Sequence, residues 1–155
     1  MSRGDFDVVD PKLSGSTPAA KYKTKAGNTA IKAGEWVVRG TAGDIEYVVL
    51  AANGSSNTSS YIGVAASNDT NTASLDGEIF VFDNPDYLFR GRPSTAGNLA
   101  TSILNNQVTL DVSGAGLMTI DEDDTTNGTF IIRGFDTSAG TIDVQMAAAD
   151  HISQG

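Results

Sequence analysis

The chain has 155 residues, no cysteine and a formal net charge of −9, and 39% of its residues are apolar. This length and composition are those of one globular domain, or one domain with an arm, and they exclude disorder throughout. Without cysteine, a disulfide framework, a thiolate metal site and a cysteine nucleophile are excluded as well.

The charge is unevenly placed along the chain. Residues 1–39 carry a net charge of +3, and the rest of the chain carries −12. Phosphate neutralisation needs clustered lysine and arginine, so we expect no nucleic-acid partner. The lysines within residues 1–39 either meet an acidic surface or form a solvated strand face. The first residues lack the apolar core of a secretion signal and no apolar run reaches 18 residues, so we expect no membrane partner.

Residues 1–18 are expected to form an extended N-terminal arm, because Pro11, Gly15 and Pro18 stand among serines and threonines. The arm is not uniformly polar. Its apolar residues would be poorly covered in a free monomer, which makes them candidates for contacts with a partner chain. These residues are Phe6, Val8, Val9 and Leu13.

From residue 19 the sequence consists of short runs rich in β-branched and aromatic residues, bounded by Gly, Asn, Asp and Ser. In the first half this pattern predicts strands within 20–26, 36–39, 45–52, 61–66 and 77–82. Two polar loops, 53–60 and 67–76, separate the later strands. Gly63 inside a strand indicates a bulge or a close approach of two backbones.

The turn at 83–86 is a candidate boundary between two sub-modules, 19–83 and 84–147, of one β-rich domain spanning 19–155. Apolar residues at helical spacing after Ser94 and Thr95 predict one short helix at about 95–104. Further strands are expected at 87–91, 107–112, 117–121, 129–133 and 141–146. The sequence therefore predicts an all-β protein, a small antiparallel β-barrel or sandwich with one short helix and an N-terminal arm.

The sequence contains no recognisable catalytic or cofactor constellation. A triad or a zinc site cannot be built around His151, the one histidine. Read as an EF-hand starting at Asp123, the acidic run 121–124 has Gly134 where the bidentate glutamate belongs. The run is then either a solvated turn or a looser calcium loop. We expect no enzymatic activity, no cofactor and no metal site.

One stretch resembles the small capsid decoration, or cement, proteins of tailed bacteriophages. Its turn-and-strand motifs cover about fifty residues (roughly a third of the chain), with Gly and β-branched residues at the characteristic places. The matching positions are Ala33, Gly34, Glu35 and Val37, then Ile62, Gly63, Val64 and Ala65, then Gly77 and Glu78. From Asp86 onward the chain departs from the family core and extends beyond it.

This resemblance implies a structural virion protein on the outer surface of an icosahedral capsid, made in the host cytoplasm. Its partners would be the major capsid protein and further copies of itself, usually as a homotrimer that bridges neighbouring capsomers. The N-terminal arm is then our candidate for capsid or inter-subunit contacts.

Two other interpretations remain at this point. The chain is alternatively a receptor- or carbohydrate-binding β-module of a phage fibre or baseplate, with Tyr61 and the loops 53–60 and 67–76 as its binding surface. A hydrolase built on paired carboxylates is the third interpretation, and a screen of glycan and peptide substrates would reveal it.

Overall fold

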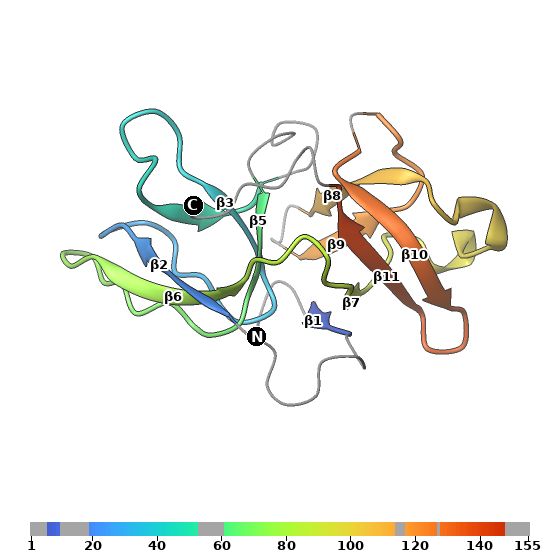
Figure 1. Cartoon of the computed structure of the whole chain (residues 1–155), viewed down its shortest axis with the longest axis horizontal. Helices are drawn as coiled ribbons and strands as arrows, with labels where there is room; N and C mark the ends of the chain where they lie inside the picture. Colours follow the sequence, from blue (N-terminus) through green and yellow to red (C-terminus); the bar gives the residue numbers. More distant parts are fainter. Residues whose placement is uncertain (1–5, 10–18, 53–60, 114–116, 127, 148–155) are drawn as a thin grey trace.

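The computed structural model describes residues 6–9, 19–52, 61–113, 117–126 and 128–147. The protein is nearly all β, with 44% strand against 5% helix, which confirms the predicted fold class. Two antiparallel sheets pack together as a sandwich, and they lie on the two sides of the view in Figure 1.

The first sheet has the strand order β2-β6-β5-β3-β4. Its strands are β2 (Ala20–Thr24), β3 (Trp36–Arg39), β4 (Val48–Leu50), β5 (Tyr61–Ala65) and β6 (Gly77–Phe82). A parallel bridge between Lys23 and Tyr47 connects the β2 edge with the residue preceding β4. The sheet therefore curls until its two edges meet.

The second sheet has the order β1-β7-β11-β10-β8-β9. Its strands are β1 (Asp7–Val8), β7 (Phe89–Gly91), β8 (Gln107–Val112), β9 (Met118–Asp121), β10 (Phe130–Asp136) and β11 (Thr141–Met146). A parallel bridge between Pro93 and Ile120 connects the residues after β7 with β9. This sheet curls in the same way, and β1 lies outside that closure, on β7.

Two apolar cores hold the molecule together, and β3 separates them because successive side chains of a strand point to opposite faces. Val37 belongs to the smaller core inside the first sheet, whereas Trp36 and Val38 face the larger one. The smaller core consists of Tyr22, Ile31, Val37, Val48, Ile62, Ala65, Ile79 and Val81. The larger core joins the two sheets and contains most of the buried aromatic rings, among them Phe6, Trp36, Tyr61, Phe89 and Phe130.

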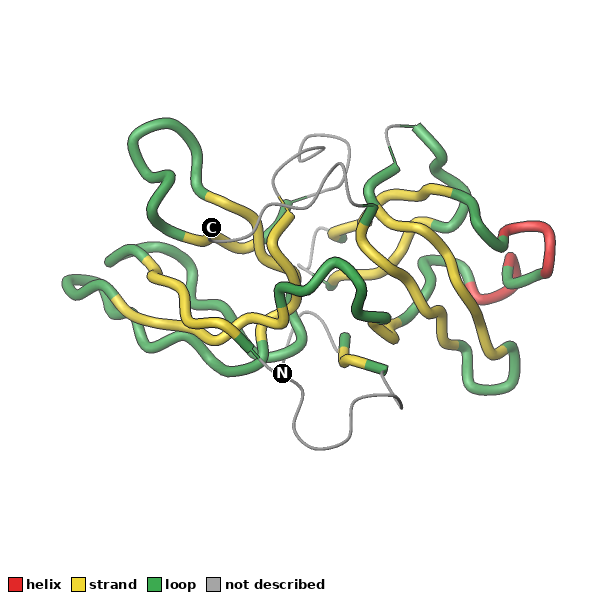
Figure 2. The backbone as a smooth tube through the Cα atoms, viewed as in Figure 1, coloured by secondary structure: helices red, strands yellow, loops and turns green. Residues whose placement is uncertain are grey.

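The predicted helix at about 95–104 is wrong. Two separate 3₁₀ turns, Ala96–Asn98 and Thr101–Ile103, occupy this region, with Leu99 and Ala100 extended between them. They are the red segments of Figure 2, at the end of the second sheet remote from the first. Gly, Asn, Ser and Thr are weak helix formers, and a segment this short depends on tertiary contacts. Here Leu99, in the extended link, and Ile103, in the second 3₁₀ turn, both reach the larger core.

The chain passes from the first sheet to the second between Phe82 and Phe89, which is where the sequence indicates a boundary. One segment departs from this division. Residues 6–9 of the predicted arm lie against the second sheet, although they precede the first sheet in the chain.

Candidate interaction surface

The N-terminal segment, residues 6–9, is docked on its own chain and touches both sheets. β1 pairs with β7 through Asp7 opposite Arg90 and Val8 opposite Phe89. The Phe6 N–H donates to the Gly34 carbonyl at 3.1 Å, and the Val9 N–H donates to the Leu88 carbonyl at 2.7 Å. The segment therefore bridges the turn before β3 and the start of β7.

The four predicted contact residues have different positions. Phe6 is 3% exposed, and its ring packs edge-on against Trp36 with centroids 5.4 Å apart. A capsid contact through Phe6 would therefore require the segment to leave this core. Val8 and Val9 are half-buried and remain accessible from outside, whereas Leu13 lies outside the described residues.

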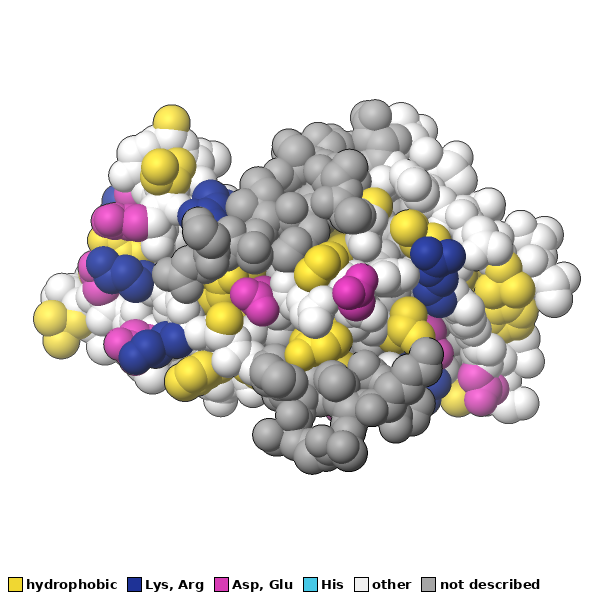
Figure 3. All heavy atoms as spheres, viewed as in Figure 1, with side chains coloured by type: hydrophobic (Ala, Val, Ile, Leu, Met, Phe, Trp, Pro, Cys, Tyr) yellow, Lys and Arg dark blue, Asp and Glu magenta, His cyan; other side chains and the backbone are white. Residues whose placement is uncertain are grey.

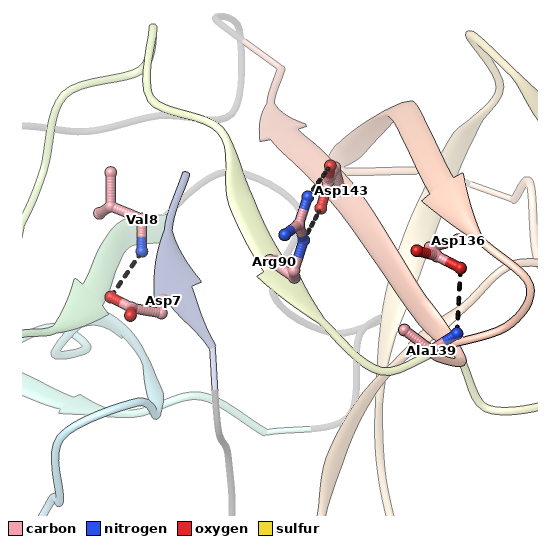
Figure 4. A network of polar contacts seen from close by, with 6 residues as sticks. All are labelled: Asp7, Val8, Arg90, Asp136, Ala139 and Asp143. Atoms are coloured by element: carbon pink, nitrogen blue, oxygen red, sulfur yellow. Dashed lines mark hydrogen bonds and ion pairs between the residues drawn. The ribbon is translucent and has the colours of Figure 1, made fainter. Parts of the chain in front are cut away.

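A groove of about 390 Å³ runs beside the N-terminal segment. Its lining comes from β1, β7 and the start of β11: Asp7, Val8, Val9, Arg90, Gly91, Arg92 and Thr141. Figure 4 shows the Arg90 guanidinium beside the Asp143 carboxylate, with nitrogen–oxygen distances of 2.8 and 3.0 Å. This ion pair joins two directly paired residues of β7 and β11 beside the groove, and the hydrogen bond to Asp143 holds the pKa of Arg90 above its ordinary value.

The motif residues of the phage resemblance meet in three adjacent strands. Gly34 adopts a left-handed conformation with φ of 90°, and its N–H donates to the Ala65 carbonyl at 2.9 Å. The Ala65 N–H in turn donates to the Glu35 carbonyl at 2.8 Å. A Cβ on Gly63 would overlap the Phe82 carbonyl, which explains the glycine predicted to allow a close backbone approach. These positions therefore secure the turn before β3 and the packing of β5 on β6.

Glu35 is fully buried, and its carboxylate accepts the Lys32 N–H at 2.9 Å. The same turn is closed by the Glu35 N–H donating to the Lys32 carbonyl. A buried carboxylate that accepts a backbone N–H of its own turn serves that turn, because it has no access to a partner in solution.

The aromatic residue assigned to the receptor-binding alternative is not at the surface, so that assignment is wrong. Tyr61 is fully buried, its ring packs against Trp36 and Phe130, and burial raises its pKa. Loop 53–60 lies outside the described residues. In loop 67–76, the Asp69 carboxylate accepts a hydrogen bond from the Thr24 hydroxyl, which fastens the loop to β2, and one from the Asn71 N–H within the loop.

The carboxylates of the acidic run 121–124 accept hydrogen bonds from neighbouring turns. Glu122 is 2% exposed and accepts the N–H groups of Ser94 and Thr95 and the side-chain amide of Asn98. Asp124 accepts the Thr126 N–H at 2.9 Å, which lowers the pKa of Asp124. In the described part of the chain, no three His, Cys, Asp or Glu side chains are grouped as a metal ion would need. The carboxylates of this run accept hydrogen bonds within the chain, and Glu122 is buried where a solvated turn would leave it exposed.

Lysines of the N-terminal half pair within the chain. Lys25 lies 2.7 Å from the Asp44 carboxylate, and Lys21 lies 3.7 Å from Glu78. Lys23 stands over the Tyr47 ring at 5.6 Å. On the face drawn in Figure 3, basic and acidic side chains are interspersed over the first sheet. This mixture favours a solvated strand face, because nucleic-acid binding needs a basic patch or stripe.

A hydrogen bond to Asp76 changes the pKa of Tyr47, the residue that precedes β4. The Tyr47 hydroxyl donates to the Asp76 carboxylate at 2.9 Å, and this bond is the main cause that raises the pKa of Tyr47 to about 12. Since the folded pKa is raised, the stabilising contribution of Tyr47 is present below pH 10.0 and is lost as the pH rises through about 12. Asp76→Ala is therefore expected to lower the Tyr47 pKa towards 10.0.

Ultraviolet absorbance of tyrosinate against pH measures this shift, with Tyr47→Phe to assign the transition. Asp86→Ala removes an exposed carboxylate elsewhere on the surface and should leave the Tyr47 transition unchanged. A Tyr47 pKa that stays near 12 without Asp76 would show that the hydrogen bond is not its cause.

Among the described residues, no helix has the length and apolar character needed to cross a membrane. The chain matches no protein-family model, and a search of curated proteins finds no relative.

Proposed function

We propose that this protein is a structural virion protein that binds the outer surface of an icosahedral phage capsid and stabilises it by bridging neighbouring capsomers. The main support is the junction at Gly34, Glu35 and Ala65, where two separate parts of the decoration-protein motif are hydrogen-bonded to each other. The third part, Gly77–Glu78, begins β6, the strand beside β5. Residues apart in the sequence thus form one contiguous three-strand unit.

The mechanism that we propose is stabilisation by linkage. A protein that binds the assembled shell and not its separated subunits stabilises the shell by its own binding free energy. At a free concentration a hundred times Kd, this amounts to about 2.7 kcal/mol per site. Association of the chain as a homotrimer would multiply the contacts made at one site and add avidity.

The test adds the purified full chain to capsids of a tailed phage that lack their decoration protein. We expect the protein to cosediment with the capsids and to raise the temperature at which they disrupt, with a midpoint that depends on protein concentration. Val8→Asp and Val9→Asp change the accessible residues of the N-terminal segment and should weaken cosedimentation.

Phe80→Asp is the matched control for these variants, because Phe80 is exposed on β6, away from the N-terminal segment. Light scattering on the same sample should give a mass near three times 16.1 kDa. Capsids of the cognate phage that neither bind the chain nor gain thermal stability would overturn the proposal.

A further inference from the structure

The two sheets repeat one topology. The five strands β2 to β6 can be numbered one to five along the chain, and so can the five strands β7 to β11. Across each sheet the order of these numbers is then the same, 1-5-4-2-3. In both sheets these strands pair antiparallel, and a parallel bridge closes the gap between the first and third strands. β1 is the additional strand, and it is attached to the second sheet only.

The repeat extends to the register of individual residues. We matched residues of the two sheets by their strand partners. The match starts from the pairs between the second and fourth strands and proceeds from strand to strand in the same way in both sheets. Equivalent positions are Trp36 and Gln107, Val64 and Ile131, Phe82 and Gln145, Val81 and Val144, Ala20 and Phe89, and Tyr22 and Gly91.

The turns before the second strands confirm the equivalence. Gly34 and Asn105 both adopt positive φ, 90° and 66°, two residues before β3 and β8 respectively. Each donates its N–H to the fourth strand of its sheet, to the carbonyls of Ala65 and Ile132 at 2.9 and 2.8 Å. Apart from glycine, asparagine is among the residues that adopt left-handed backbone most readily, so both turns carry a residue suited to this geometry.

One equivalent pair differs in a way that involves the N-terminal segment. Tyr22 is 4% exposed, and its ring contributes to the core of the first sheet. The equivalent Gly91 has no side chain, and a Cβ placed there would overlap the ring of Phe6. Phe6 therefore supplies to the second sheet the aromatic ring that the first sheet carries on its own strand.

We propose that the edge of β7, with the space over Gly91 that the Phe6 ring occupies, is a strand-acceptor site. In the assembled protein, the N-terminal segment of a second copy of this chain fills this site. The occupant is residues 6–9, which add β1 to the edge of β7 and place Phe6 between Gly91 and Trp36. This is recognition of an extended peptide by strand addition, in which backbone pairing gives affinity and the ring gives specificity.

Three observations favour exchange between copies. The donor strand pairs through only two residues of β7, so that little backbone pairing has to be broken to release it. It is joined to β2 through residues 10–18, and a linker of that length spans up to about 30 Å when extended, enough to reach an adjacent molecule. Val8 and Val9 stay half-buried beside the groove in a single chain, and an adjacent copy would cover them.

The test uses two full-length variants with one cysteine each, Asp7→Cys and Arg90→Cys, because the chain has no cysteine of its own. Positions 7 and 90 are directly paired, and Cα atoms of paired strands are about 4.5–5.5 Å apart, within disulfide range. One variant is labelled with ¹⁵N, the two are mixed and oxidised, and mass spectrometry identifies the linked peptides. No single chain carries both cysteines, so a disulfide between positions 7 and 90 joins two different chains, and a yield above the collisional background reports exchange.

Exchange predicts this disulfide at a yield at least about tenfold above the mixture of Asp7→Cys with Asp86→Cys, since pairing raises the effective thiol concentration to the millimolar range. Adding Gly91→Ala to the Arg90→Cys chain should abolish the excess, because the new methyl group takes the place of the Phe6 ring. Gly97→Ala is the matched control, since a Cβ there meets nothing within 4 Å.

A chain carrying both cysteines separates the remaining outcomes. If it closes within itself while the mixture gives no excess, the segment is donated only to its own chain and the proposal fails. If neither the mixture nor the double variant forms the disulfide, the pairing of β1 with β7 is itself wrong. The experiment is done in solution without capsids, so its failure leaves capsid binding untouched.

Discussion

Replacing Trp36 with alanine is expected to destabilise the fold by about 3–5 kcal/mol, the range for removing a buried aromatic side chain from a core. Trp36 is fully buried and has aromatic neighbours from both sheets and from the N-terminal segment. Its ring lies 4.5 Å from that of Phe130, 5.0 Å from Phe89 and 5.4 Å from Phe6, centroid to centroid. No nearby side chain can fill the resulting cavity without losing its own contacts.

The measurement is urea denaturation followed by circular dichroism, which does not depend on tryptophan fluorescence. A loss of this size is a large share of the about 5–15 kcal/mol by which a native protein is stable. Phe80→Ala is the control: Phe80 is 46% exposed, and its removal should cost well under about 2 kcal/mol. Equal losses for the two variants would mean that Trp36 does not join the two sheets.

Glu122→Ala is expected to cost about 1–3 kcal/mol, because it removes a buried acceptor and leaves the Thr95 N–H without its partner. The Ser94 N–H keeps the Ile120 carbonyl, and the Asn98 amide keeps Asp123. The carboxylate accepts the Ser94 N–H at 3.0 Å, the Thr95 N–H at 3.1 Å and the Asn98 amide at 2.9 Å. These residues follow Pro93, where the parallel bridge to β9 closes the second sheet. The variant should therefore loosen that closure before it affects the first sheet.

Denaturation measures the loss, and amide hydrogen exchange locates it: Ser94, Thr95 and Ile120 should exchange faster, while the amides of β5 keep their protection. The matched control is Glu78→Ala. Glu78 is exposed and makes a 3.7 Å ion pair, which contributes within about 1 kcal/mol. If both glutamates behave alike, Glu122 is not the anchor of the 94–98 segment. If added calcium stabilises the parent chain but not Glu122→Ala, the carboxylate has a metal-binding role instead.

Much of the local structure is predictable from the sequence. Four strands have the predicted bounds, at 36–39, 77–82, 107–112 and 141–146, because alternating apolar residues and bounding glycines are local signals. β4 is shorter than predicted: Ile45 and Glu46 form a turn, and only Val48–Leu50 is strand. The hydrophobic run there extends beyond the residues that find a pairing partner.

The candidate contact residues are only partly predictable. Apolar residues in the N-terminal segment indicate that something covers them, but not which surface does so. The Phe6 ring packs on the backbone of Gly91, which is far along the chain. In the sequence, Gly91 has the pattern of an ordinary strand end. The repeat has no marker in the sequence either, since its equivalent turns carry glycine at position 34 and asparagine at position 105.

By itself, then, the sequence determined that this is an all-β protein of short strands without an evident catalytic constellation, and where most of the strands begin and end. The tertiary structure alone decided the repeated sheet order, the two 3₁₀ turns in place of a helix, the burial of Tyr61 and the docking of Phe6 over Gly91. The physical reason is the sequence separation over which each kind of interaction acts. Strand propensity and turn chemistry act between neighbouring residues, whereas core packing and strand pairing join residues whose separation leaves no periodic trace in the sequence.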